Sequence, residues 1–125
     1  MKCYYQGFTR PNEADKKFNG FVSFIIPELG IKFRGQFKGD LDECEYASLL
    51  ALLEFVELNF HLFKDRRLEI FGNNFEIINQ VNSEISPSSE LEPFCNLAQS
   101  YKEKIPYILD WIPTDENMAQ DGMVL

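Results

Sequence analysis

Residues 21–56 read FVSFIIPELGIKFRGQFKGDLDECEYASLLALLEFV, which is the pattern of a hairpin followed by a long helix. The first part predicts two strands, Phe21–Ile26 and Ile31–Lys38, joined by a tight Pro-Glu-Leu-Gly turn. Asp42 then begins a predicted helix whose apolar residues recur every three or four positions, with Glu45 at capping-box spacing. A hairpin that leads directly into an amphipathic helix favours a sheet with helices packed on it.

Outside this stretch the chain continues to alternate strand and helix patterns. The remaining elements are a strand at Cys3–Phe8, a polar turn at Thr9–Asn19, a strand at Leu68–Phe71, a helix at about Asn74–Val81 with Phe75 turned inward, a helix begun by a Ser89–Glu92 capping box, a strand at Ile105–Ile112 and a short terminal helix capped by Thr114. Three hairpin-linked strands therefore precede strand–helix alternation. We expect one α/β domain over residues 1–125, with a mixed sheet and helices packed on it.

Length and composition exclude several classes of protein. The chain has 125 residues, of which 45% are hydrophobic and 26% charged, so it suits one domain with a substantial core rather than a disordered chain. No apolar run approaches the roughly 20 residues that a membrane-spanning helix needs. The first residues, Met-Lys-Cys-Tyr-Tyr-Gln, lack the apolar core of a secretory signal. We therefore expect no membrane partner.

Cysteine number and net charge add two further expectations. Cys3, Cys44 and Cys95 are odd in number and share no metal-ligand spacing, which favours reduced thiols in the cytoplasm over a disulfide framework or a zinc site. The chain has 20 acidic side chains against 12 Lys and Arg, a net charge of −8. This charge disfavours a strong general grip on the phosphates of nucleic acid.

Four short stretches match the motifs of one family in order and spacing. They are Tyr5-Gln6-Gly7 where the family has aromatic-Asp-Gly, Cys44-Glu45-Tyr46-Ala47-Ser48-Leu49 where it has Ala-Glu-Tyr-x-x-Leu, Gly72-Asn73-Asn74 where it has Gly-Asp-Ser, with a helix ending Asn79-Gln80-Val81-Asn82, and Trp111-Ile112-Pro113 leading through Asn117 to Asp121. The chain thus resembles the ribonuclease H-like superfamily, in particular domains related to type 1 ribonuclease H, over nearly its whole length. The resemblance implies a five-stranded mixed sheet, with three antiparallel strands followed by parallel ones.

The resemblance also implies a site, and two of its four positions depart from the family. Family members hydrolyse RNA in RNA–DNA hybrids with two divalent ions, such as Mg²⁺ or Mn²⁺, held by four carboxylates. The matching positions here are Gln6, Glu45, Asn73 and Asp121. Glu45 and Asp121 are therefore the metal-ligand candidates, and the other two are neutral amides. Because two carboxylates are missing, we expect family-type hydrolysis to be lost. His61 also does not match the histidine that some members use in product release.

Three functions stay open. The first is a binding or interaction module for a protein partner or a second copy of the chain. The second is a Mg²⁺- or Mn²⁺-dependent hydrolase of RNA in RNA–DNA hybrids that uses Glu45, Asp121 and substitute acids. The third is a nucleic-acid binder without cleavage, through Lys32, Arg34 and Lys38 on one strand face. The candidates for substitute acids are Asp40, Asp42, Glu43, Glu76, Asp115 and Glu116.

Each of these residues also has a structural interpretation. Glu45 completes a helix cap with Asp42, and Asp121 is a solvated residue at a helix end. The pair Asn73-Asn74 suits the cap of the helix that follows. The basic residues of the third strand are typical of an edge strand protected against association. Trp111 is expected among the core and strand residues.

Overall fold

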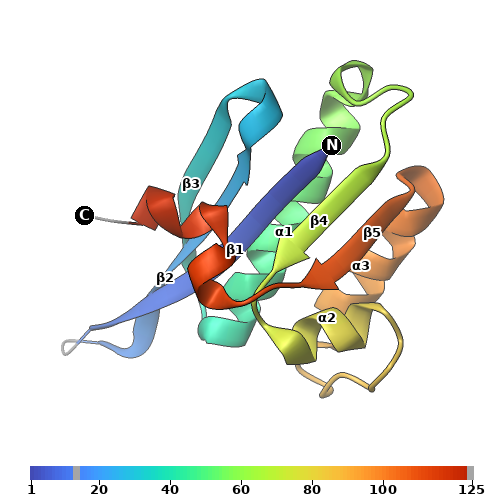
Figure 1. Ribbon diagram of the computed structural model, residues 1–125. Helices are drawn as coiled ribbons and strands as arrows, with labels where there is room; N and C mark the ends of the chain where they lie inside the picture. Colours follow the sequence, from blue (N-terminus) through green and yellow to red (C-terminus); the bar gives the residue numbers. More distant parts are fainter. Residues whose placement is uncertain (13–14, 124–125) are drawn as a thin grey trace.

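The chain folds around a five-stranded sheet with the strand order β3-β2-β1-β4-β5. The computed structural model describes the backbone of residues 1–12 and 15–123 and the side chains of residues 1–10 and 19–120. The strands are β1 (Lys2–Asn12), β2 (Asp15–Ile26), β3 (Ile31–Lys38), β4 (Leu68–Gly72) and β5 (Tyr107–Trp111). The first three pair antiparallel, whereas β1 with β4 and β4 with β5 pair parallel (Figure 1). This arrangement confirms the expected mixed α/β sheet.

The two faces of the sheet are covered differently (Figure 1). The helices are α1 (Leu41–Leu58), α2 (Phe75–Val81) and α3 (Glu92–Lys104). The 3₁₀ turns are η1 (Pro27–Leu29), η2 (Phe60–Leu62), η3 (Thr114–Glu116) and η4 (Met118–Met123). Helices α1 and α3 lie behind the sheet, while η4 contacts β1 and β2 from the front. Within the described ranges, no helix is long and apolar enough to cross a membrane.

The core lies between the sheet and α1. The helix contributes a stripe with no exposed surface, formed by Leu49, Leu52, Leu53 and Val56. These positions recur at three- and four-residue steps, as an amphipathic helix requires. From the sheet, Cys3 and Tyr5 occupy alternate positions of β1 and are fully buried. The alternation leaves Gln6 on the opposite face of the sheet, where η4 lies.

Strand β1 and helix α1 meet in direct backbone contact at Gly7. A Cβ atom on this residue would lie 2.4 Å from the carbonyl carbon of Cys44 and 2.5 Å from the amide nitrogen of Glu45. Only glycine tolerates so close an approach. This contact fixes the start of α1 against β1 and places Glu45 beside the Gln6–Gly7 step.

The start of α1 corrects one prediction. The helix is capped by Asp40, whose carboxylate accepts a hydrogen bond from the Glu43 amide (2.9 Å), while the Glu43 carboxylate accepts from the Asp40 amide (3.0 Å). The capping box thus lies two residues before the predicted pair of Asp42 and Glu45. Two acidic pairs of identical spacing overlap here, and only the earlier one coincides with the end of the extended backbone. Glu45 therefore does not take part in the helix cap that was predicted for it.

Other expectations about the ends of elements are also wrong. Helix α3 begins at Glu92 after Leu91, without a side-chain cap, so the predicted Ser89–Glu92 box does not form. Thr114 does not cap η3, which follows Pro113. Strand β1 extends to Asn12 and β2 starts at Asp15, so the predicted polar turn is too long, and residues 13 and 14 lie outside the described backbone. Cross-strand pairing extends both strands beyond their apolar parts.

Two aromatic residues expected in the interior lie on the surface. Phe75 is 61% exposed and Trp111 is 46% exposed. Their rings meet edge to face, with centroids 6.2 Å apart. Both residues stand at ends of elements, Phe75 at the first residue of α2 and Trp111 at the last residue of β5, where neither the sheet nor a helix covers them.

Candidate functional site

Three of the four positions singled out by the sequence converge where β1, β4 and α1 meet. Gln6 lies in β1, Glu45 lies in the first turns of α1, and Asn73 directly follows β4. The amide of Gly7 donates a hydrogen bond to the Glu45 carboxylate, which ties the helix residue to β1. The side chain of the fourth position, Asp121, lies outside the described side chains.

Glu45 is a buried carboxyl group. Only 3% of the residue is exposed, and its Oε2 atom has no hydrogen-bond partner among the residues that the structure describes. The pKa of Glu45 is raised from 4.5 to about 8, chiefly by burial; the hydrogen bond from Gly7 lowers the pKa and the nearby charge of Asp42 raises it, and both effects are smaller. The carboxyl group is therefore mostly protonated at neutral pH.

Gln6 presents a second buried oxygen without a donor. Its side-chain Oε1 atom has no partner among the described residues. Its backbone carbonyl, in contrast, accepts hydrogen bonds from the hydroxyls of Ser23 (2.8 Å) and Ser48 (3.0 Å). The backbone of this position is thus fixed by two neighbouring elements, while the side-chain oxygen is left for a proton donor or a cation.

Asn73 is held by a residue whose role the sequence did not predict. The side-chain amide of Asn117 donates to Asn73 Oδ1 (2.6 Å) and to the Tyr5 carbonyl (2.9 Å). Asn117 Oδ1 also accepts from the Ala119 amide (3.0 Å). With 1% of its surface exposed, Asn117 is a buried clamp between β1, Asn73 and the turn before Asp121. The available signal was its place four residues before Asp121 in the last motif.

Asn74 and Asp42 form a second polar link across the site. Asn74 Oδ1 accepts from the Ile77 amide (3.2 Å) and caps α2, which confirms the predicted cap for this residue. Its Nδ2 atom donates to Asp42 Oδ1 (3.2 Å). Of the candidate substitute acids, Asp42 is the one whose charge acts on Glu45. Asp40 and Glu43 are engaged in the helix cap. The other three candidates are exposed, namely Glu76, Asp115 and Glu116.

Among the residues whose side chains are described, Glu45 carries the one carboxyl group at the four matching positions. Within the part of the chain whose side chains are described, no group of three or more Asp, Glu, His or Cys could hold a metal ion. Two dications need several anionic oxygens to offset their charge. Gln6 and Asn73 carry no charge, and Asn73 Oδ1 already accepts from the amide of Asn117.

The basic candidates lie on the same face of the sheet as Gln6. In the register, Gln6 pairs with Ser23 and Ser23 pairs with Arg34, so Arg34 is two strands, about 10 Å, from Gln6. Its guanidinium lies over the ring of Phe21 at 5.2 Å from the centroid. Lys32 and Lys38 lie in the same strand, β3. Because β3 is the first strand in the order of the sheet, these basic residues stand on an edge strand, as predicted.

Comparisons with solved structures agree on the fold. The structure of LC11-RNase H1, isolated from compost by a metagenomic approach, matches with a TM-score of 0.81 at 18% identity, covering 98% of this chain and 91% of that one. The same protein in complex with an RNA/DNA hybrid matches at 0.78, also at 18% identity, with 98% and 92% of the chains covered. RNase H1 from the halophilic archaeon Halobacterium salinarum NRC-1 matches at 0.74 with 16% identity, over 97% and 91%. No family model and no curated protein sequence matches the chain.

Proposed function

We propose that this domain, which has the ribonuclease H-like fold, does not cleave nucleic acid by two-metal hydrolysis and instead acts as an interaction module for a protein partner. The observation that carries the proposal is the hydrogen bond from Asn117 to Asn73 Oδ1. It uses one of the two lone pairs of an uncharged amide oxygen at the position of the family's fourth-strand aspartate. The surrounding backbone remains intact, so the fold is kept while the chemistry of the site is altered.

Charge arithmetic supports the loss of two-metal hydrolysis. Two divalent ions bring four positive charges, which the family offsets with four carboxylates. Gln6 and Asn73 supply none, and only Glu45 and Asp121 retain a carboxyl group at the matching positions. Charging Glu45 in its buried position is itself unfavourable, because burial raises its pKa to about 8. A two-ion centre here would be about two charges more positive than in the family.

Exposed apolar side chains support contact with a protein. Large hydrophobic residues that are at least 44% exposed are Leu41, Leu58, Phe60, Phe75, Ile85, Leu97 and Trp111. Scattered exposed residues are ordinary, but a paired Phe75 and Trp111 form a contiguous aromatic surface. The cysteines are free and buried, which suits a reducing compartment, so we also propose a cytoplasmic location.

The proposal is tested by cleavage of an RNA–DNA hybrid in Mg²⁺ and in Mn²⁺. We expect no cleavage by the wild-type protein above the level of a Glu45→Ala variant. Calorimetry should likewise show no Mg²⁺ or Mn²⁺ binding that depends on Glu45 and Asp121. A Gln6→Asp, Asn73→Asp variant returns both missing carboxylates and should gain metal binding. Cleavage by the wild-type protein that is lost in Glu45→Ala would overturn the proposal.

A hydrolase with substitute acids is the second candidate. It is favoured by Asp42, whose carboxylate lies against Asn74 and raises the pKa of Glu45. In this alternative Asp42 joins Glu45 and Asp121 around a divalent ion. Asp42→Asn should then abolish metal-dependent cleavage, whereas Glu76→Gln, a change at an exposed acid, should leave it unchanged.

Binding of nucleic acid without cleavage is the third candidate. It is favoured by the basic edge strand that shares a face with Gln6 and by Arg34 stacked over Phe21. LC11-RNase H1, a protein with the same fold, binds an RNA/DNA hybrid. A complex held by phosphate contacts should weaken steeply as salt rises, and Lys32→Ala with Lys38→Ala should flatten that dependence. The net charge of −8 disfavours this candidate relative to the first.

A further inference from the structure

The acidic charge of this protein is concentrated in one part of the chain. Residues 1–67 carry ten acidic and ten basic side chains, whereas residues 68–125 carry ten acidic and two basic ones. The whole net charge of −8 therefore belongs to the second segment, which forms β4, α2, α3, β5 and the last turns. Its two basic residues, Lys102 and Lys104, lie in the last turn of α3. Such asymmetry points to a partner of opposite charge.

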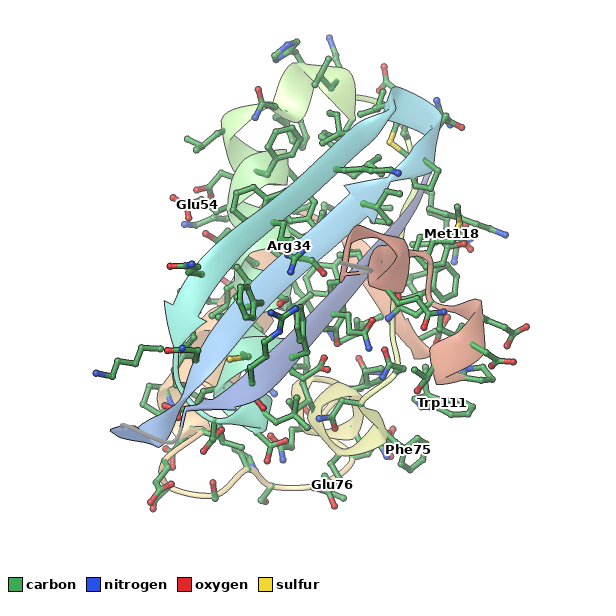
Figure 2. The ribbon with its side chains drawn as sticks, turned by 90° about the vertical axis from the view of Figure 1, so that its left-hand side faces the viewer. Arg34, Glu54, Phe75, Glu76, Trp111 and Met118 are labelled. Carbon is green, nitrogen blue, oxygen red and sulfur yellow. The ribbon has the colours of Figure 1, made fainter. Side chains whose placement is uncertain are left out.

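The same segment carries the exposed aromatic pair of the molecule. Figure 2 shows Phe75 and Trp111 together at one corner of the molecule, with Glu76 beside Phe75. The indole is held in place because Trp111 Nε1 donates to the Asn73 carbonyl (3.2 Å) and its ring meets Phe75 edge to face. Exposed rings that are already fixed lose little conformational entropy when a partner covers them.

Acidic residues accompany both rings. Glu76 follows Phe75 in α2, while Asp110 precedes Trp111 in β5 and points to the opposite face of the sheet. Asp115 and Glu116 lie in η3, which begins three residues after Trp111. All four are exposed. Neither residues 68–101 nor residues 105–125 contain a Lys or Arg that could neutralise them within the segment.

We propose that Phe75, Trp111 and the exposed carboxylates of Glu76, Asp115 and Glu116 form a docking surface for a basic segment of a partner protein. Arginine and lysine can stack on the aromatic faces, with Trp the best ring for this, and their charges meet the carboxylates at the rim. Apolar side chains of the same segment can pack against the exposed edge of Phe75. A nucleic acid does not fit this surface, because its phosphates would meet negative charge. The proposal rests on the proposed function, since it names the surface and the partner chemistry of the interaction module.

Trp111 is the single tryptophan of the chain and therefore reports directly on this surface. We would titrate the full chain with a peptide of alternating Arg and Leu and follow the tryptophan emission, with a peptide of alternating Glu and Leu as control. The expected result is a saturable blue shift with the basic peptide only. The surface charge is checked separately: relative to free N-acetyltryptophanamide, Trp111 should keep a larger fraction of its quenching by Cs⁺ than of its quenching by iodide.

Matched variants separate this surface from general attraction to an acidic protein. Phe75→Ser combined with Glu76→Lys should weaken peptide binding by about tenfold or more. Leu58→Ser combined with Glu54→Lys likewise replaces a large apolar residue by Ser and a Glu by Lys on α1, where both residues are exposed, and should leave binding within about twofold. Figure 2 places Glu54 far from Phe75 in that view. Equal loss in both variants, or no loss in either, would overturn the proposal.

Two further outcomes would assign the surface to another occupant and so overturn the proposal. One is an emission shift with decathymidylate as large as that with the basic peptide. The other is a dimer of the wild-type chain in sedimentation that Phe75→Ser dissolves. The cleavage assay is independent of these measurements. Metal-dependent cleavage would refute the proposed function, whereas the peptide titration would still test whether the Phe75–Trp111 surface binds a basic segment.

Discussion

The two faces of β1 are under different physical constraints, close packing on one face and polar interactions on the other. On the face toward α1, Gly7 is confined by backbone atoms 2.4 Å from where a Cβ would lie. On the opposite face, Gln6 has a buried side-chain oxygen to which none of the described residues donates, and Asn73 beyond the end of β4 is held through the amide of Asn117. The comparison teaches that steric contact on one face preserves the fold, whereas the chemistry on the other face can change without loss of the fold.

The largest expected effect concerns the packed face. Gly7→Ala should destabilise the protein by about 4 kcal/mol or more, because the added methyl group meets the backbone of α1, which cannot move without displacing the helix. Gly35→Ala is the matched control in β3. Its Cβ would lie 3.1 Å from the end of the Phe33 ring, a side chain that can shift, so we expect a cost within about 1 kcal/mol. Urea denaturation measures both, and equal costs would contradict the special constraint at Gly7.

The next effect concerns the site and depends on pH. The pKa of Glu45 in the folded protein, about 8, lies above its ordinary value of 4.5, so the folded state binds the proton more tightly than the unfolded state. Stability from this group is present below the ordinary value and is lost as the pH rises through 8. We expect a loss of about 3 kcal/mol between pH 5 and pH 8 in the wild-type protein. Glu45→Gln should remove most of this loss, and unchanged pH dependence in the variant would exclude Glu45 as its source.

A third effect tests the polar clamp of the site. Asn117→Ala removes the donors to Tyr5 and Asn73 and the acceptor for Ala119, and should cost about 2 to 3 kcal/mol. Asn117→Asp keeps the acceptor but loses both donors, so it should lie close to the alanine variant. Thermal unfolding measures both, with Asn96→Ala, a change on the exposed side of α3, as the control. If the aspartate variant were as stable as wild type, the donated hydrogen bonds would not hold the site together.

The same contrast explains how much the sequence could predict. Strand β3 is predicted to the residue, because its alternation is local and Gly30, with φ of 66°, ends the turn before it. The role of Asn117 is not predicted, since its partner Tyr5 is 112 residues away in sequence. The burial of Glu45 is also missed, because its spacing from Asp42 imitates a helix cap that forms two residues earlier. Periodicity records local packing, whereas the partners of a site residue are set by tertiary structure.

The exposed aromatic pair shows that local periodicity can also predict burial where there is none. The helical spacing of Phe75 and the strand position of Trp111 both predict burial, and the residues are nevertheless exposed. Each lies at the end of its helix or strand. There the apolar periodicity of the sequence continues, but no neighbouring helix or strand covers the side chain. The order of the four family-like stretches predicted the fold correctly, because that order depends on the whole chain rather than on any one of its ends.

The smallest expected effect concerns Tyr5, on the face of β1 that packs against α1, and separates the role of its ring from that of its hydroxyl. Tyr5 is fully buried, and within the described part of the chain its hydroxyl has no hydrogen-bond partner, while its ring fills the space that a Cβ on Gly72 would need. Tyr5→Phe keeps the ring and removes the unpaired hydroxyl, so it should stabilise the protein by about 1 kcal/mol. Tyr46→Phe is the matched control, because that buried hydroxyl donates to Gln80 Oε1 (2.5 Å) and its loss should destabilise by about 1 kcal/mol or more. Opposite signs in urea denaturation would establish that shape alone selects the residue at position 5, whereas a destabilised Tyr5→Phe would mean that the hydroxyl has a partner.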